Sequence, residues 1–441
     1  MKLAQLALAA ILASPALLPA AVIGTNPPAL PVTAERIAAL PAAEQPAWRD
    51  YLARSNALRA ADQAFFAAEL KAHNLATATT PTSGRGSGLS LDRPDAWFAS
   101  DEARKIADNV LSFQTPAGGW SKNMNFTNHA RQPGERFAPG NESPPTAAAM
   151  NAKATTPDND KPADPSWHYV GTFDNDATIT QLRFLARVAT ALGEKKDAPY
   201  RAAFLRGLDY MFAAQYPNGG IPQVYPLEGG YHDTITINDN AMINVLETFR
   251  DIASDDPSYA FVPADARRRA AACFERGIAS LLACQITVNG HHTIWCQQHD
   301  ALTLAPASAR NYEMPSQTAG ESGSVVLFFM QLPNPSPQVV AAVHAAAAWF
   351  EKTALRDIAF KPAPDGSGRA VIPTPGAGPI WPRYSEIGSD RPIFGDRDKS
   401  IHDDVSEISK ERRNGYAWFG DTPKRALEHY AKWAKLHPEK K

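Results

Sequence analysis

Cysteine is scarce in this chain of 441 residues, which has only Cys273, Cys284 and Cys296. So few thiols do not make a disulfide framework. Cys273 and Cys284 lie on one predicted helix, roughly 16 Å apart at about 1.5 Å per residue, which is too far for a bridge. Cys284 reaches Cys296 only if the chain doubles back at the hairpin-type dipeptide Asn289-Gly290, and buried free thiols are an equal alternative. The cysteine spacing also argues against zinc.

A large excess of charge of one sign is also absent, since 44 Lys and Arg balance 46 Asp and Glu. Nothing therefore indicates a nucleic-acid partner. No later apolar run reaches the ~18 residues of a membrane span. Lys2, the apolar stretch 3–18 and the small residues at 19–21 have the pattern of a secretory signal, with a buried N-terminal helix as the alternative. We expect a secreted or periplasmic monomer with neither nucleic acid nor membrane as a partner.

The motifs of several common enzyme classes are missing as well. The chain has no Gly-x-Ser-x-Gly, Walker loop, dinucleotide fingerprint or zinc-helix motif. A glycosidase-type pair of carboxylates is not excluded, because the distance between two Asp or Glu side chains is not visible in a sequence. The chain does have a hydrophobic content of 44%, which is enough for a sizeable core.

Helical periodicity dominates from Asp95 onward and predicts a mainly α fold. The predicted helices are 95–114, 176–192, 197–216, 239–253, 264–285, 319–331, 336–354 and 422–436, and the long loops are 115–172, 217–237, 286–318 and 361–420. Loops of this length are uncommon unless they are functional, and they hold most of the Trp, Tyr, His and paired charges. We therefore expect helical hairpins in a ring or stack, with the chemistry carried by loops.

The N-terminal part has a different composition. Residues 22–34 are rich in Pro and Ala and predict a linker, and 34–72 carry two Ala-rich helical patterns. A Thr/Ser/Gly/Pro stretch over 77–88 predicts a flexible connection. The expected parts of the chain are a signal peptide over 1–21, a linker and helical extension over 22–92, and one main domain over 93–436.

Two short segments place Asp and Asn directly ahead of apolar-periodic runs. They are Asp174-Asn175-Asp176 and Asn238-Asp239-Asn240. Calcium takes about six to eight oxygens from carboxylates, amides, carbonyls and water, and two such clusters facing each other across a cleft would supply several of them. Helix N-capping is the alternative, but capping needs one such residue per helix. Asp176 fits either role, as a ligand or as the cap of its helix.

Two further loop segments combine charge with aromatic side chains. In the first, Arg310 lies beside Tyr312 and Glu313. Arg is the natural bidentate partner of a carboxylate, so Arg310 either forms a structural pair with Glu313 or takes part in function. In the second, which spans 381–420, Arg, Asp and aromatic residues alternate densely. That segment forms either surface ion pairs or a packed wall that binds a sugar or a polyanion.

The chain also contains Gly-Gly-Trp at 118–120 and a near-echo, Asn-Gly-Gly, at 218–220, each after a predicted helix. Double glycine gives the left-handed geometry that ends a helix, and helix termination with core filling is the simpler explanation of the glycines. The aromatic residue that follows, Trp120, would line a rim where ring faces stack on sugars. Lys122 is a candidate for binding an anion.

Taken together, these segments resemble a family 10 polysaccharide lyase, a pectate lyase. The matching stretches are Gly-Gly-Trp-Ser-Lys-Asn at 118–123, Phe-Asp-Asn at 173–175, Gly-Gly-Ile-Pro-Gln-Val-Tyr-Pro at 219–226, Asn-Asp-Asn-Ala-Met at 238–242, Trp-Cys-Gln-Gln-His-Asp at 295–300, Ala-Arg-Asn-Tyr-Glu at 309–313 and Arg-Pro-Ile-Phe-Gly-Asp-Arg-Asp at 391–398. They follow the family's order over roughly 93–436, which makes that range the expected catalytic domain. The resemblance implies an (α/α) toroid and calcium-dependent cleavage of α-1,4-polygalacturonate by β-elimination, giving 4,5-unsaturated oligogalacturonides.

The resemblance also implies roles by position. Arg310 would be the base that removes the C5 proton, and Asp174, Asn175 and Asp239 would be Ca²⁺ ligands. The residues expected to bind substrate are Lys122, Tyr312, Arg391, Arg397, Trp120 and His299. Arginine is an awkward base at its usual pKa, so we expect the cation and a dry cleft to disfavour its charged form and the activity to have an alkaline optimum.

Two other functions stay open. A glycoside hydrolase on an (α/α) barrel, acting on uronate-containing glycans, would use Asp174 and Asp239 as acid and base. A non-catalytic exported protein would only bind acidic glycans. An assay for the unsaturated product, run with and without calcium, separates all three.

Overall fold

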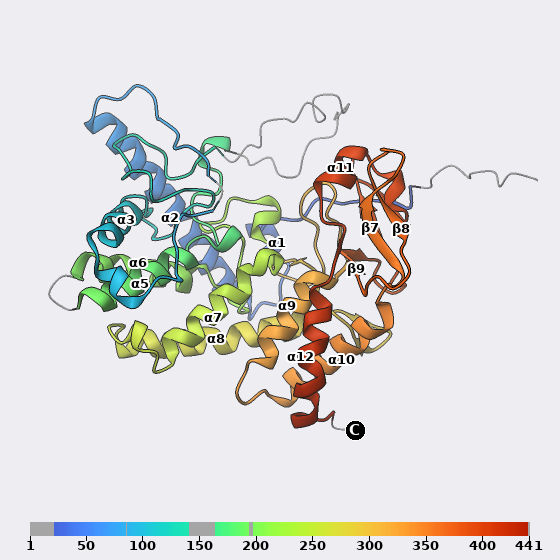
Figure 1. Cartoon of the computed structure of the whole chain (residues 1–441). Helices are drawn as coiled ribbons and strands as arrows, with labels where there is room; N and C mark the ends of the chain where they lie inside the picture. Colours follow the sequence, from blue (N-terminus) through green and yellow to red (C-terminus); the bar gives the residue numbers. More distant parts are fainter. Residues whose placement is uncertain (1–21, 85, 141–163, 194–196, 440–441) are drawn as a thin grey trace, which may run out of the picture.

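A computed structural model of the chain describes residues 22–84, 86–140, 164–193 and 197–439. The predicted signal peptide over 1–21 lies outside these residues. Within them the fold is mainly α (Figure 1). No helix in this part of the chain is long and apolar enough to cross a membrane.

The helices pack side by side in pairs, such as α5 with α6, α7 with α8 and α9 with α12. They are α1 Ala34–Ala38, α2 Gln45–Ala72, α3 Asp101–Ser112, α5 Ile179–Leu192, α6 Ala198–Ala214, α7 Ala241–Ala253, α8 Ala264–Cys284, α9 Ala319–Met330, α10 Pro337–Thr353, α11 Lys410–Gly415 and α12 Thr422–Leu436. Polar caps define several starts, as where the Ser100 hydroxyl accepts a hydrogen bond from the Ala103 amide. The predicted mainly α toroid of helical hairpins is confirmed, and every predicted helix is found.

Three glutamines that each follow a helix make the same two hydrogen bonds with their side-chain amides. The acceptors are Gly118 O and Ala203 O for Gln114, Gly219 O and Cys273 O for Gln215, and Thr293 O and Ala342 O for Gln285. In each case the first bond closes the loop that follows the glutamine, and the second bond reaches a carbonyl of another helix. The bonds therefore link α3 to α6, α6 to α8 and α8 to α10. The hairpins repeat in structure although no sequence repeat is apparent.

Three buried tryptophans complete this pattern. The indole N–H groups of Trp120, Trp295 and Trp381 donate to the carbonyls of Val110, Leu281 and Phe350, at the ends of α3, α8 and α10. Trp120 is fully buried. The prediction that Trp120 binds substrate is therefore wrong, because its ring fills the core and its only polar atom satisfies a helix end.

The strands are short and lie mostly in the loops. They are β1 Gly24–Thr25, β2 Ile235–Thr236, β3 Thr287–Val288, β4 His291–His292, β5 Gln298–His299, β6 Gln317–Thr318, β7 Ile358–Pro362, β8 Arg369–Pro373, β9 Trp381–Pro382, β10 Tyr384–Ser385, β11 Phe394–Gly395, β12 Ser400–His402 and β13 Phe419–Gly420. The antiparallel β7–β8 hairpin and α11 show that much of the predicted loop 361–420 is ordered structure. A second core cluster, which includes Tyr312, Tyr384 and Trp418, lies beneath it. This segment is the packed wall rather than a solvated face.

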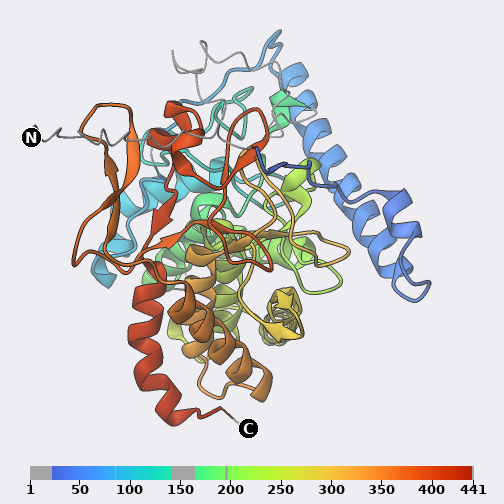
Figure 2. The same cartoon turned by 90° about the vertical axis from the view of Figure 1, so that its right-hand side faces the viewer.

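The N-terminal segment is docked along its length, with α2 on the outer edge of the molecule (Figure 2). β1 pairs with β12, Val32 is buried and the Val32 amide donates to Asp233. The prediction of a linker over 22–34 is therefore wrong, since this segment contributes a strand and core contacts. The flexible connection predicted over 77–88 is also wrong in part, because Thr79 and Ser83 form bridges with the 124–135 region. The boundaries at 92 and 436 stay a prediction.

All three cysteines are free and buried. The chain does double back between β3 and β4, where Asn289 and Gly290 have φ of 51° and 83°, as a tight hairpin turn requires. Of the two alternatives for Cys284 and Cys296, the structure shows the free thiols.

Candidate active site

Two tight turns place the predicted calcium ligands. The turn Asp174–Asp176 precedes α5, the turn Asn238–Asn240 precedes α7, and the two turns contact each other. Asn175 and Asp239 have φ of 52° and 51°, a left-handed conformation that Asn and Asp adopt more readily than other residues. No side chain of either turn caps the helix that follows. Helix capping therefore does not explain these clusters.

Of the two roles considered for Asp176, the helix cap is wrong, because the N-cap of α5 is Thr178. The Asp176 carboxylate accepts a hydrogen bond of 2.5 Å from the Asn244 amide on α7, which ties the start of α5 to α7. A role for Asp176 as a metal ligand stays a prediction.

The turns open into a polar cleft of about 240 Å³. It is lined by Lys122, Asn123, Tyr169, Asp174, Asn175, Gln223, Tyr231, Asn238, Asp239, Gln297, Gln298, Ala309, Arg310 and Glu313. The structure thus brings together the predicted base, the three predicted metal ligands and Lys122, from segments almost 190 residues apart in the sequence.

The carboxylates of this cleft repel one another. Burial, and then the negative charges of Asp174 and Glu321, raise the pKa of Asp239 to about 6. Asp174 forms an ion pair with the Lys122 ammonium, and both side chains are largely buried. Two carboxylates and an amide that converge in this way are the donor set of a hard divalent cation, and a bound cation would offset their repulsion. The residues fit Ca²⁺.

Arg310 lies across the cleft in a bidentate pair with Glu313. Its Nε and Nη2 donate to the two Glu313 oxygens at 3.0 and 2.5 Å. Burial by itself would lower the pKa of Arg310, but the charge and hydrogen bonds of Glu313 raise that pKa well above its ordinary value. The cleft without a cation therefore does not disfavour the charged form of Arg310, because Glu313 outweighs burial. The part of the expectation that depends on the cation stays a prediction.

Glu313 is the counterion of Arg310 and is itself fully ionised. Despite burial, the charge and hydrogen bonds of Arg310, with the Tyr416 hydroxyl, lower the pKa of Glu313 to about 2. Tyr416 donates to Glu313 Oε1 at 2.6 Å. A side chain from 103 residues further along the chain thus supports the pair.

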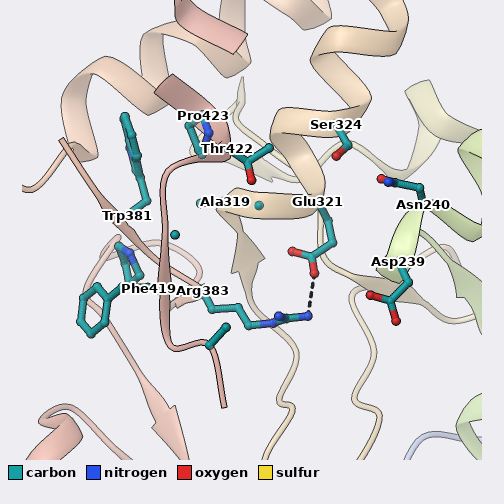
Figure 3. A pocket seen from close by; sticks show the side chains of 14 residues that line it. Asp239, Asn240, Ala319, Glu321, Ser324, Trp381, Arg383, Phe419, Thr422 and Pro423 are labelled. Carbon is teal, nitrogen blue, oxygen red and sulfur yellow. Dashed lines mark hydrogen bonds and ion pairs between the residues drawn. The ribbon is translucent and has the colours of Figure 1, made fainter. Parts of the chain in front are cut away.

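Arg383 is a residue of this region that the site prediction missed. Its Nη2 donates to Glu321 at 2.8 Å and to Asn238 at 3.0 Å. It lies in a second pocket of about 270 Å³ that begins at Asp239 and continues past Glu321 to Phe419 (Figure 3). Glu321 was a usable signal, because it is the one acidic residue in an otherwise apolar and small helix sequence. This pocket extends the polar cleft beyond the metal ligands.

His299 is buried in the core. Its Nε2 accepts from the Cys296 amide at 3.1 Å and its Nδ1 donates to Leu304 O at 2.8 Å. Burial lowers the pKa of His299 to about 4. The prediction that His299 binds substrate is wrong, because both of its ring nitrogens bond to backbone.

Tyr312 is also buried, and its ring packs beside the Arg310 guanidinium, 5.0 Å from the ring centre to Cζ. The prediction that Tyr312 binds substrate directly is wrong, because the Tyr312 side chain is buried and packs against Arg310. Arg391 and Arg397 lie outside the lining of the cleft, in ion pairs with Glu386 and Glu411. Substrate binding by these two arginines stays a prediction.

Comparison with known proteins gives consistent matches. The model of the pectic acid lyase family matches residues 114–427. A solved structure of a family 10 polysaccharide lyase from Cellvibrio cellulosa is 30% identical, covering 78% of this chain and 98% of that chain, with a TM-score of 0.62. A mutant of that lyase in complex with trigalacturonic acid matches with the same values. No curated protein matches the chain.

Proposed function

Because the chain belongs to polysaccharide lyase family 10 and is a pectate lyase, we propose that it cleaves α-1,4-polygalacturonate by calcium-assisted β-elimination, with Arg310 as the base. The observation that carries the proposal is the convergence of Asp174, Asp239 and Arg310 on one cleft. The trigalacturonic acid bound by a similar lyase supports an acidic galacturonan as the substrate. Family membership argues against both the hydrolase and the non-catalytic binding protein.

Asp174, Asn175 and Asp239 would hold the Ca²⁺ ion. When bound, Ca²⁺ withdraws electron density from the substrate carboxylate and stabilises the charge that develops when the C5 proton leaves. Lys122 neutralises Asp174 through its ammonium group, so it would exchange this partner for a substrate carboxylate as the cation binds.

Arg383 would bind a uronate carboxylate next to the scissile bond. Its guanidinium is largely buried between Glu321 and Asn238, and the charge of Glu321 helps to keep it protonated. A fixed cation of this kind recognises a carboxylate through parallel N–H donors. Arg383 and Lys122 therefore flank the metal ligands as anchors for neighbouring sugars.

Arg310 acts as base only in the fraction of molecules in which its guanidinium is neutral. Pairing with Glu313 keeps this fraction small, so the rate must rise with pH as the neutral fraction grows. The neutral nitrogen takes the C5 proton, the electron pair of the broken C5–H bond forms the C4–C5 double bond, and the C4 oxygen leaves with the other half of the chain. That oxygen takes up a proton as it leaves, so one proton passes from C5 to the new hydroxyl in the net reaction. No water is consumed.

The test is an assay on polygalacturonate that follows the ultraviolet absorbance of the conjugated double bond. Activity should disappear after chelation and return with Ca²⁺ but not with Mg²⁺. Arg310→Lys and Asp174→Ala should each abolish most turnover. New reducing ends without absorbance would establish hydrolysis, and binding without any product would establish a non-catalytic protein. We also propose that the protein is secreted, as its substrate is extracellular.

A further inference from the structure

A second polar cluster lies behind one wall of the cleft. It consists of His168, Glu228 and His232, whose side chains are 10%, 2% and 3% exposed. The two histidines come from segments more than 60 residues apart in the sequence. The proposed reaction uses none of the three residues.

The two imidazoles converge on one carboxylate oxygen. His168 Nδ1 lies 2.9 Å from Glu228 Oε1, and His232 Nδ1 lies 3.2 Å from the same atom. One potential ligand atom from each residue lies within 4.8 Å of the others. In a tetrahedral zinc site, ligand atoms that are about 2.0–2.1 Å from the metal lie roughly 3.3 Å from one another. The two separations from Glu228 Oε1 are therefore close to the spacing of a zinc site.

We propose that His168, Glu228 and His232 bind a divalent transition-metal ion of the zinc class, at a site separate from the calcium ligands. Two imidazole nitrogens and one carboxylate suit zinc and its neighbours in the transition series. Calcium is excluded by the same donors, because it takes oxygen ligands almost without exception. Three protein ligands leave the fourth tetrahedral position to a water molecule.

Metal binding needs an ionised Glu228 and two neutral imidazoles. Without a metal, burial raises the pKa of Glu228, but the charge of His232, the hydrogen bond from His168 and the Tyr169 amide hold that pKa below its ordinary value. A bound cation would replace the positive charge that His232 supplies in the metal-free cluster. An ion of charge +2 held by this carboxylate and two neutral imidazoles would leave a net charge of +1 in the site.

The second carboxylate oxygen is fixed by the backbone. Glu228 Oε2 accepts a hydrogen bond of 3.0 Å from the Tyr169 amide. Tyr169 has a φ of 55°, a conformation that is uncommon and strained for a bulky side chain. Outer contacts of this kind orient a ligand in metal sites. The strained backbone at Tyr169 thus places its amide where it holds Glu228 Oε2, which leaves Oε1 facing the two histidines.

The site would brace the wall of the cleft. The hydroxyls of Tyr169 and Tyr231 are 3.1 Å apart, and both residues line the cleft. Each is the chain neighbour of a proposed histidine ligand, and the Lys122 ammonium lies 3.5 Å from the centre of the Tyr169 ring. The metal would cross-link the two loops and act as a positioning element for this wall, without touching substrate.

A metal-free hydrogen-bonded triad is the competing explanation. In that case the two Nδ1–H groups donate to Glu228, and the cluster is complete without an ion. The two explanations differ in metal content and in the response to chelators, and both can be measured on the intact chain.

The first experiment is metal analysis of the protein after equilibration with micromolar Zn²⁺ and gel filtration. We expect one zinc per chain, and none in His168→Ala and His232→Ala. The control is His129→Ala, which removes a histidine that also pairs with a glutamate, Glu135, and should leave the zinc content unchanged. Cobalt in place of zinc should give the visible absorption of a tetrahedral site. Zinc content no higher than in the two variants would overturn the proposal.

The second experiment needs no variant. Removal of the metal with 1,10-phenanthroline should lower the melting temperature. The difference should be roughly 5 °C from the melting temperature measured with free zinc at about a hundred times its dissociation constant. Zn²⁺ should restore the melting temperature, whereas Ca²⁺ should not. A melting temperature that is unaffected by phenanthroline and Zn²⁺, in a protein that Ca²⁺ still activates, would refute the zinc site and leave the lyase function in place.

Discussion

The Asp174–Asp239 cluster and the His168–Glu228–His232 cluster lie on either side of Tyr169 and handle negative charge in opposite ways. In the first, burial and the charges of neighbouring carboxylates raise the pKa of Asp239. In the second, the charge of His232, the hydrogen bond from His168 and the Tyr169 amide hold the pKa of the more deeply buried Glu228 below its ordinary value.

The difference shows that depth of burial alone does not set the pKa of a carboxylate, because the hydrogen-bond donors and positive charge around Glu228 outweigh its burial. In the Asp174–Asp239 cluster, carboxylates lie near one another, and a hard cation from solvent would offset their repulsion. In the histidine cluster, the imidazole nitrogens of His168 and His232 already lie against the Glu228 carboxylate. Lys122 connects the two regions, since its ammonium pairs with Asp174 and lies over the Tyr169 ring.

The largest effect is expected at Arg310, opposite both clusters. Arg310→Ala should reduce kcat/KM on the order of 10²- to 10⁴-fold, the contribution of a general base. In the native enzyme, log kcat/KM should rise by about one unit per pH unit between about pH 6 and 10, because only the neutral guanidine works. Because Glu313 raises the pKa of Arg310, Glu313→Gln should move that rise to lower pH.

Steady-state rates on polygalacturonate across this pH range give the measurement. Arg269→Ala is the matched control, since Arg269 is exposed and its ion pair with Asp209 lies at the surface. A flat profile in the native enzyme would show that another group takes the proton.

Asp239→Asn should have the next largest effect, on the order of 10²-fold in turnover, because it removes one of two charged ligands for a cation that supplies several kcal/mol. The calcium concentration for half-maximal rate should rise in parallel. Glu228→Gln, on the other side of Tyr169, should leave that concentration unchanged. Titration of both variants with Ca²⁺ measures this concentration in each. An equal increase in both variants would show that the two clusters act as one calcium site.

Lys122→Met should change calcium affinity in the opposite direction. The ammonium competes with a cation for Asp174, so its removal should tighten Ca²⁺ binding by roughly five-fold, about 1 kcal/mol. The KM for polygalacturonate should rise at the same time, because an anchor for a uronate is lost. Calorimetric titration and steady-state kinetics measure the two changes separately, and weaker calcium binding would contradict the competition.

The smallest effect on turnover is expected at Trp120. Trp120→Phe should lower the free energy of unfolding by about 1–3 kcal/mol, because Val110 O loses a buried donor, while the KM stays the same. Urea unfolding measures the loss. Trp295→Phe should behave alike, since its indole makes the equivalent bond to Leu281 O. A raised KM in Trp120→Phe alone would return Trp120 to the substrate-binding residues.

Helices were predictable here because their signals are local. The apolar spacing and ends of α8 place it at Ala264–Cys284, one residue from the predicted 264–285. The Asp174 and Asp239 clusters were visible for the same reason, as each is a short run of residues.

The wrong predictions concern contacts that depend on how the chain folds, whether the partner is near or distant in sequence. The residue types around Trp120 do not indicate that its indole donates to Val110 O at the end of α3. The loop around His299 turns so that Cys296 and Leu304 occupy both ring nitrogens, and the residue types alone do not indicate this geometry. The histidine cluster is not visible in the sequence, because His168 is 60 residues from Glu228. The Pro and Ala residues between 22 and 34 indicated a linker because the sequence does not show the surface on which this segment packs.

The docked N-terminal segment has one more consequence. The Asn26 amide lies within 3.0 to 3.1 Å of the carbonyls of Arg310, Asn311 and Glu313 and donates to all three. A protein that lacks only residues 22–30 would retain every proposed catalytic side chain, yet the backbone around Arg310 would lose these three hydrogen bonds. The N-terminal segment thus supports the loop that holds the proposed base, and the shortened protein should turn over slowly.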